Sequence, residues 1–140
     1  MSVPKWRQTV SKTQYLNLLY ELNIKMGHIV NNASKKYKTN YGDVLIKDCV
    51  NALQYAQLAN SIFMSSQTPQ SDYELRRECL LKVRGYAEII PTISYIYLEL
   101  LKDGGKYKQI VNLEEYISDT CSNIHKMVSG VLKYDKSLLK

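Results

Sequence analysis

The stretch that decides the fold class is residues 72–102, DYELRRECLLKVRGYAEIIPTISYIYLELLK. Its apolar side chains recur at alternating spacings of four and three residues, which is the heptad pattern of a helix packed against other helices. Glycine and proline occur once each, so little opposes a long helix, although Pro91 removes one backbone donor and predicts a kink. The predicted core seam consists of Leu75, Cys79, Lys82, Tyr86, Ile89, Ile93, Ile96 and Leu100.

Three other segments have the same helical character. Residues 12–36 carry one apolar stripe, and residues 107–133 carry another. Residues 43–64 place a heptad seam at Leu45, Cys49, Ala52, Ala56, Ala59 and Phe63, in which the alanines allow close approach of a neighbour. Turn formers separate the segments at 38–42, 65–71 and 103–105. These short links predict an all-α, up-down-up-down antiparallel four-helix bundle that forms a single domain over residues 1–140.

The charge balance favours an anionic partner. Lysine and arginine total 19 against 13 acidic residues, which gives a formal net charge of +6 at pH 7. Such a surplus is typical of proteins that contact nucleic acid phosphates. Arg77 and Arg84 are seven residues apart, so they share one helix face at a separation of about 10 Å. The candidate nucleic-acid or partner-binding residues are Arg76, Arg77, Lys82, Arg84, Lys35, Lys36 and Lys38.

A different interpretation of these charges remains open. The basic residues of 72–102 could form a solvated face on which Glu74, Glu78 and Glu88 pair with them locally. Lys82 occupies a seam position, where it could extend to water, face a subunit interface or line a nucleic-acid path. The sequence pattern alone does not choose between the binding face and the solvated face.

Residue types that carry catalysis are sparse. Cys49, Cys79 and Cys121 lie on apolar helix faces without a CxxC pair, so we expect small buried hydrophobes in a reducing cytoplasm. His28 and His125 fall at levels of the bundle that differ by about 10 Å, too far apart to share a metal. Nucleotide-binding and hydrolase motifs are missing, as are a signal peptide and an apolar run of about 20 residues. We therefore expect no enzyme activity, cofactor, metal or membrane contact.

Two stretches carry a family resemblance. Residues 76–88, RRECLLKVRGYAE, with the apolar half-helix that follows them, resemble the third helix of a four-helix bundle family. That family comprises the accessory variability determinants (Avd) of diversity-generating retroelements and the proteins encoded in intervening sequences of large-subunit ribosomal RNA genes. Residues 113–116 and 124–133 are similar to the last helix of the family. The resemblance extends over residues 15–133.

The resemblance implies a function that the residues alone do not. It implies a homopentameric barrel with a positive surface, which binds nucleic acid and a partner reverse transcriptase and supports mutagenic cDNA synthesis. The basic residues of the family map onto Arg76, Arg77, Lys82 and Arg84. Two alternatives stay open: a bundle of the ribosomal RNA intervening-sequence type, and a purely protein-binding helical module. In the last case the 12 tyrosines and the spare apolar residues would form the interface.

Overall fold

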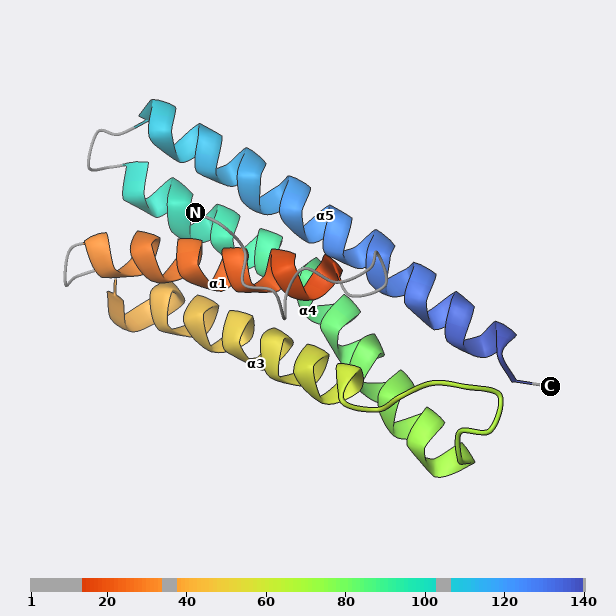
Figure 1. Ribbon diagram of the computed structural model, residues 1–140. Helices are drawn as coiled ribbons and strands as arrows, with labels where there is room; N and C mark the ends of the chain where they lie inside the picture. Colours follow the sequence, from red (N-terminus) through yellow and green to blue (C-terminus); the bar gives the residue numbers. More distant parts are fainter. Residues whose placement is uncertain (1–13, 34–37, 103–106, 140) are drawn as a thin grey trace.

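The computed structural model describes residues 14–33, 38–102 and 107–139, and these residues form a four-helix bundle. Its elements are α1 (Gln14–Asn32), the short turn η3 (Lys38–Gly42), α3 (Asp43–Asn60), α4 (Gln70–Leu101) and α5 (Tyr107–Ser137). Successive long helices run in opposite directions (Figure 1). The predicted all-α fold and its antiparallel order are therefore confirmed.

Each long helix packs against two others. Helix α1 contacts α3 and α5, while α4 contacts α3 and α5 from the other side of the bundle. Polar side chains tie the pairs together between apolar layers. The amide of Asn23 on α1 donates to the Cys49 carbonyl on α3 at 3.0 Å, and Asn51 of α3 donates to the Tyr86 hydroxyl of α4 at 3.4 Å. The second of these contacts places the Tyr86 side of α4 beside α3.

The core confirms most of the seam predicted for α3. Leu45, Cys49, Ala52, Ala56 and Ala59 are all at most 1% exposed. The small alanine side chains leave room for the helices on either side to approach closely. Phe63 does not continue this seam: it is 84% exposed, because α3 ends at Asn60 and the chain turns away before Phe63. The prediction of a helix up to residue 64 was wrong by about one turn.

The seam predicted for α4 is only partly covered: Cys79 is buried and Tyr86 and Ile93 pack against the core, but other positions of the seam are exposed. Leu75 and Ile89 are 44% and 48% exposed, and Ile96 and Leu100 are 38% and 37% exposed. Helix α4 carries two apolar stripes side by side, and the bundle covers the second one more completely. The periodicity is the same for both stripes, so spacing alone does not reveal which of them faces the other helices. The covered face consists of Tyr73, Cys79, Leu80, Val83, Ala87, Ile90, Ser94, Tyr97 and Leu98.

Helix ends differ from the predicted ones by a few residues. Helix α4 begins at Gln70 behind Pro69, two residues before the stretch that starts at residue 72, and no side-chain hydrogen bond caps it. Pro91 lies inside α4, which changes direction near its middle (Figure 1). Helix α5 runs on to Ser137, four residues beyond the predicted segment 107–133. This last turn is held because Asp135 is buried against α4.

Candidate nucleic-acid interface

Arg76 points into the protein. Its Nε lies 2.6 Å from Oδ2 of Asp135, and its Nη1 donates to the carbonyls of Ala59 at 2.9 Å and Ile62 at 3.0 Å. The side chains of Arg76 and Asp135 are 12% and 3% exposed. One guanidinium thus joins the end of α3, the first part of α4 and the last part of α5. The resemblance assigned Arg76 to a binding surface, but the structure gives it this internal position instead.

Arg77 and Arg84 lie where α4 adjoins α5. Arg77 is exposed, and Nη1 of Arg84 lies 3.3 Å from the Ser129 hydroxyl of α5. The two arginines are seven residues apart on one continuous helix, so they share the face that the sequence predicted. Of the four candidate residues on α4, these two are the ones that the structure brings onto a common accessible surface.

Helix α5 supplies further cations beside these arginines. Lys133 and Lys136 follow Ser129 by four and seven residues, so they share its side of the helix, and Lys126 lies one turn before it. All three lysines are exposed. We call this surface the α4–α5 basic face; it consists of Arg77, Arg84, Lys126, Lys133 and Lys136. The sequence analysis missed Lys136 because the predicted helical segment stopped at residue 133, although Lys136 lies seven residues after Ser129 and so on the same helix face.

Acidic side chains screen one end of the α4–α5 basic face. Nε2 of His125 lies 3.0 Å from Oε1 of Glu88, and this pair spans the same α4–α5 seam. Both side chains are well exposed, at 37% and 70%, so the pair contributes little to stability. At the other end of the face Arg77 and Lys136 are exposed, and Arg77 has the exposed acids Glu74 and Glu78 close to it in the helix sequence. The acid–histidine pair joins Glu88 to His125 of α5 and not to a basic residue of 72–102, so the local pairing within that helix stays a prediction.

Lys82 lies on the opposite flank of α4. Its Nζ is 5.4 Å from the centroid of the Tyr55 ring on α3, a cation–π distance. The rings of Tyr55 and Tyr86 stack with centroids 6.3 Å apart. Lys82 thus belongs to the α3–α4 side and not to the α4–α5 basic face. Lys35 and Lys36 lie outside the described residues, and so does the side chain of Lys38, whose backbone opens η3.

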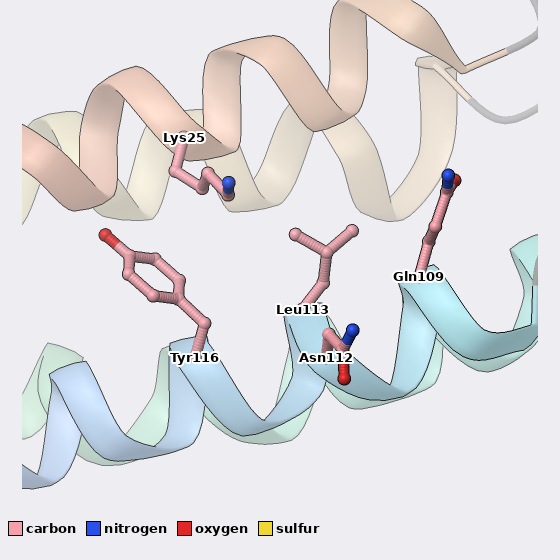
Figure 2. Close-up of a pocket in the computed structure, with 5 residues that line it drawn as sticks. All are labelled: Lys25, Gln109, Asn112, Leu113 and Tyr116. Carbon is pink, nitrogen blue, oxygen red and sulfur yellow. The ribbon is translucent and has the colours of Figure 1, made fainter.

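An open groove of about 380 Å³ separates α1 from the first part of α5. Figure 2 shows Lys25 of α1 and Tyr116 of α5 extending toward each other across it. The Lys25 Nζ lies 5.5 Å from the centroid of the Tyr116 ring. Gln109, Asn112 and Leu113 complete the lining, so these five residues offer one cation and no carboxylate. The groove thus lacks the paired acid and base that most hydrolytic sites need.

A charged cluster joins the end of α4 to α5. Lys102 Nζ lies 2.8 Å from Glu99 Oε1 and 3.8 Å from Glu114 Oε1. The hydrogen bond from Lys102 lowers the pKa of Glu99, whereas burial and the neighbouring Glu99 raise the pKa of Glu114. Glu114 Oε2 has no hydrogen-bond partner. Lys102, at the opposite end of α4 from Arg77, therefore has its charge balanced by local acids.

The cysteines behave as apolar core residues. Cys49, Cys79 and Cys121 are free thiols and are buried. Burial raises the pKa of Cys49 and of Cys121 to about 12, so both stay protonated at neutral pH. A thiol that is not ionised is a poor nucleophile and a poor metal ligand. The sequence-based prediction of small buried hydrophobes is confirmed for these three positions.

The described part of the chain offers neither a metal site nor a membrane-spanning helix. Residues 14–33, 38–102 and 107–139 hold no group of three or more His, Cys, Asp or Glu side chains placed to bind a metal ion. Over those same ranges, no helix combines the length and apolar character needed to cross a membrane. Neither result identifies a partner, so the α4–α5 basic face remains the site with the clearest chemistry.

Comparisons with known proteins do not identify a family for this chain. The sequence matches no family model, and no match was found among curated proteins or solved structures. The Avd and ribosomal RNA intervening-sequence family therefore remains a resemblance, carried by residues 76–88, 113–116 and 124–133.

Proposed function

We propose that this protein is a non-catalytic accessory factor that binds nucleic acid along the α4–α5 basic face. The observation that carries the proposal is the alignment of Arg77 and Arg84 on α4 with exposed lysines on α5. Arg77 and Arg84 are separated by about two helical turns, or about 10 Å. Successive phosphates on one DNA strand are about 3.4 Å apart along the helix axis. The distance between the two arginines therefore spans about three phosphates.

The chemistry of the face favours backbone contact over base recognition. Arginine forks and lysine ammonium groups both pair with phosphate oxygens, and arginine does so with two parallel hydrogen bonds. Such contacts position a nucleic acid without reading its sequence. We therefore expect RNA or DNA to bind with little sequence preference, and the affinity to fall steeply as the salt concentration rises.

The finer parts of the proposal come from the family resemblance. The family resemblance of residues 76–88, 113–116 and 124–133 implies a reverse transcriptase as protein partner, support of mutagenic cDNA synthesis and assembly of five copies. A cytoplasmic location agrees with three free thiols that lie buried in the core. Within this proposal the bundle holds the template or product strand while a separate enzyme carries out the chemistry.

A salt titration of binding tests the proposal. Fluorescence anisotropy with labelled single-stranded RNA and DNA would be measured for the natural chain and for the Arg77→Ala/Arg84→Ala variant. Removing two phosphate contacts should weaken binding and reduce the slope of log K against log salt by about 1.4 for these single-stranded probes. The matched control is Lys25→Ala/Lys47→Ala, which removes two exposed cations away from the face. Binding that ignores salt, or that falls equally in both variants, would defeat the proposal.

A second candidate function has one specific observation in its favour. Helix α4 exposes an apolar stripe that includes Leu75, Ile89 and Ile96, which suits a purely protein-binding module. Absence of salt-dependent nucleic-acid binding would favour that candidate. The ribosomal RNA intervening-sequence type is distinguished by gene neighbourhood, since it predicts a ribosomal RNA operon where the first proposal predicts a reverse transcriptase gene.

A further inference from the structure

Phe63, in the connection between α3 and α4, is the most exposed large apolar side chain that the structure describes. This residue, the single phenylalanine of the chain, is 84% exposed, whereas the other exposed apolar side chains lie between 37% and 57%. Removal of an aromatic ring from water is one of the largest favourable contributions that a side chain can make. The fold leaves that contribution unused at Phe63, so a bound molecule could gain it.

The backbone that carries the Phe63 ring is held by hydrogen bonds on both sides. Nη1 of Arg76 donates to the Ile62 carbonyl at 3.0 Å, and the Thr68 hydroxyl donates to the Phe63 carbonyl at 3.1 Å. The same hydroxyl accepts from the Ser65 amide at 2.8 Å, which closes a polar turn directly after the ring. A segment that is already fixed loses less conformational entropy when a ligand binds. The exposed ring is thus presented by an ordered turn.

This turn lies beside one end of the α4–α5 basic face. One guanidinium, that of Arg76, bonds both the Ile62 carbonyl at 3.0 Å and the Asp135 carboxylate at 2.6 Å. The backbone next to Phe63 is therefore a few ångströms from the last turns of α5, and Figure 1 shows the connection at that end of the bundle. The exposed Lys136 directly follows Asp135 in the chain.

The charges around this end favour an anion on the α5 side. Residues 60–71 contain no charged side chain. Over residues 120–137, α5 has a single acid, Asp135, and it is buried and paired with Arg76. The start of α4 differs, because it exposes acids at residues 72, 74 and 78. An anionic strand that reaches Phe63 is therefore expected to run toward Lys133 and Lys136 and away from the acids of α4.

We propose that Phe63 stacks on an unpaired base of a single-stranded nucleic acid whose phosphates contact the adjoining end of the α4–α5 basic face. An exposed aromatic ring beside cations is the combination with which proteins hold single strands, because every base has a face that can stack. In a duplex the base faces are already stacked on one another, and only edges and phosphates are accessible. The inference rests on the proposed function and names the class of nucleic acid.

The surroundings of the ring favour a base over an apolar pocket of a protein. Residues 65–68, which follow it, have the sequence SSQT and are entirely polar. A stable protein interface needs a well-packed apolar centre of several residues. A stacked base needs one accessible ring and a nearby cation for its phosphate, and this end of the bundle offers both.

Binding measurements with matched nucleic acids test the stacking. The probes are labelled oligothymidine of about 12 nucleotides, a duplex of equal length, and an abasic strand with the same number of phosphates. In fluorescence anisotropy, Phe63→Ala should bind oligothymidine about 5- to 150-fold more weakly than the natural chain. Its affinity for the duplex and for the abasic strand should be unchanged. The slope of log K against log salt should also stay the same, since no phosphate contact is lost.

Three further variants separate stacking from other effects. Phe63→Trp keeps a ring and should retain the affinity for oligothymidine, whereas Phe63→Leu should lose it as Phe63→Ala does. Tyr95→Ala is the matched control, because Tyr95 is 57% exposed but lies about 27 Å further along α4 than Arg77. Binding by this control should be unchanged. Circular dichroism should show equal helix content in all the variants.

The outcomes distinguish this inference from the proposed function. If Phe63→Ala or Phe63→Leu binds oligothymidine as tightly as the natural chain, or if Phe63→Ala loses duplex binding equally, the stacking is overturned. A Phe63→Leu variant with natural affinity would indicate a general apolar contact of the kind that a protein pocket or a membrane surface makes. In each of these cases, salt-dependent binding that falls in Arg77→Ala/Arg84→Ala would leave the proposed function standing. Absence of binding to all three probes would overturn both.

Discussion

The ion pair between Arg76 and Asp135 should be among the most sensitive points of the fold. Replacing Arg76 with alanine leaves the Asp135 carboxylate, 3% exposed, without its counter-charge. It also leaves the carbonyls of Ala59 and Ile62 without the Nη1 donor. Breaking a buried pair from one side costs about 3–5 kcal/mol, because one charge remains buried alone. That is a large fraction of the total stability of a small domain, about 5–15 kcal/mol.

Urea unfolding followed by circular dichroism measures this loss. Arg76→Ala and Asp135→Ala should each lower the free energy of unfolding by about 3–5 kcal/mol. The double variant Arg76→Met/Asp135→Leu should recover the part of the loss that comes from the unpaired buried charge, while the carbonyls of Ala59 and Ile62 still lack their donor. The adjacent Arg77→Ala is the control, and it should change stability by less than about 0.5 kcal/mol. If Arg76→Ala were as mild as Arg77→Ala and instead lost nucleic-acid binding, the internal role of Arg76 would be refuted.

Three further outcomes follow from the core and its titratable groups. Ala56→Leu should destabilise the fold by about 1–3 kcal/mol in urea unfolding, because Ala56 is 0% exposed and a larger side chain must displace its neighbours. The free energy of unfolding should fall from pH 9 toward pH 12, because unfolded thiols ionise near 9 while Cys49 and Cys121 have a pKa of about 12. The fall should reach at most about 1.4 kcal/mol per pH unit for each thiol, and Cys49→Ala should make it shallower. At pH 8 a thiol-specific chromogenic reagent should label these cysteines only after denaturant is added, and rapid labelling of the folded chain would contradict their burial.

The fold was predictable from the sequence because several signals agreed. Helical periodicity, scarce glycine and proline, and turn formers at three links all favoured the same bundle. The heptad of α3 had a single apolar stripe, so its buried face was predicted correctly from Leu45 to Ala59. Helix α4 has two such stripes, and spacing carries no information on which one faces the other helices. That choice depends on how α3 and α5 pack, and a sequence pattern taken one helix at a time does not contain it.

The candidate site was predictable only in part, for a related reason. Arg77 and Arg84 could be paired by their i, i+7 relation, since both positions belong to one helix. Arg76 could not be separated from Arg77 in the same way, because its buried partner Asp135 lies 59 residues further along the chain. A signal did exist: Asp135 follows Val131 by four residues and so continues the apolar stripe of α5. An acid in that position indicates a buried partner more than a frayed end.

The internal pair and the α4–α5 basic face are two consequences of one helix register. Arg76 and Asp135 fix how far α4 and α5 are shifted along each other, and the Arg84–Ser129 contact two turns later has the same register. In that register Arg77 adjoins the exposed turn that carries Lys133 and Lys136. A shift of one turn, about 5.4 Å, would separate Arg76 from Asp135 and move the cations of the two helices out of line. A buried ion pair contributes little net stability compared with an apolar pair, so its value here lies in the specificity of alignment. The Arg76→Met/Asp135→Leu variant should therefore stay folded yet bind nucleic acid more weakly, and unchanged binding would show that apolar packing alone sets the register.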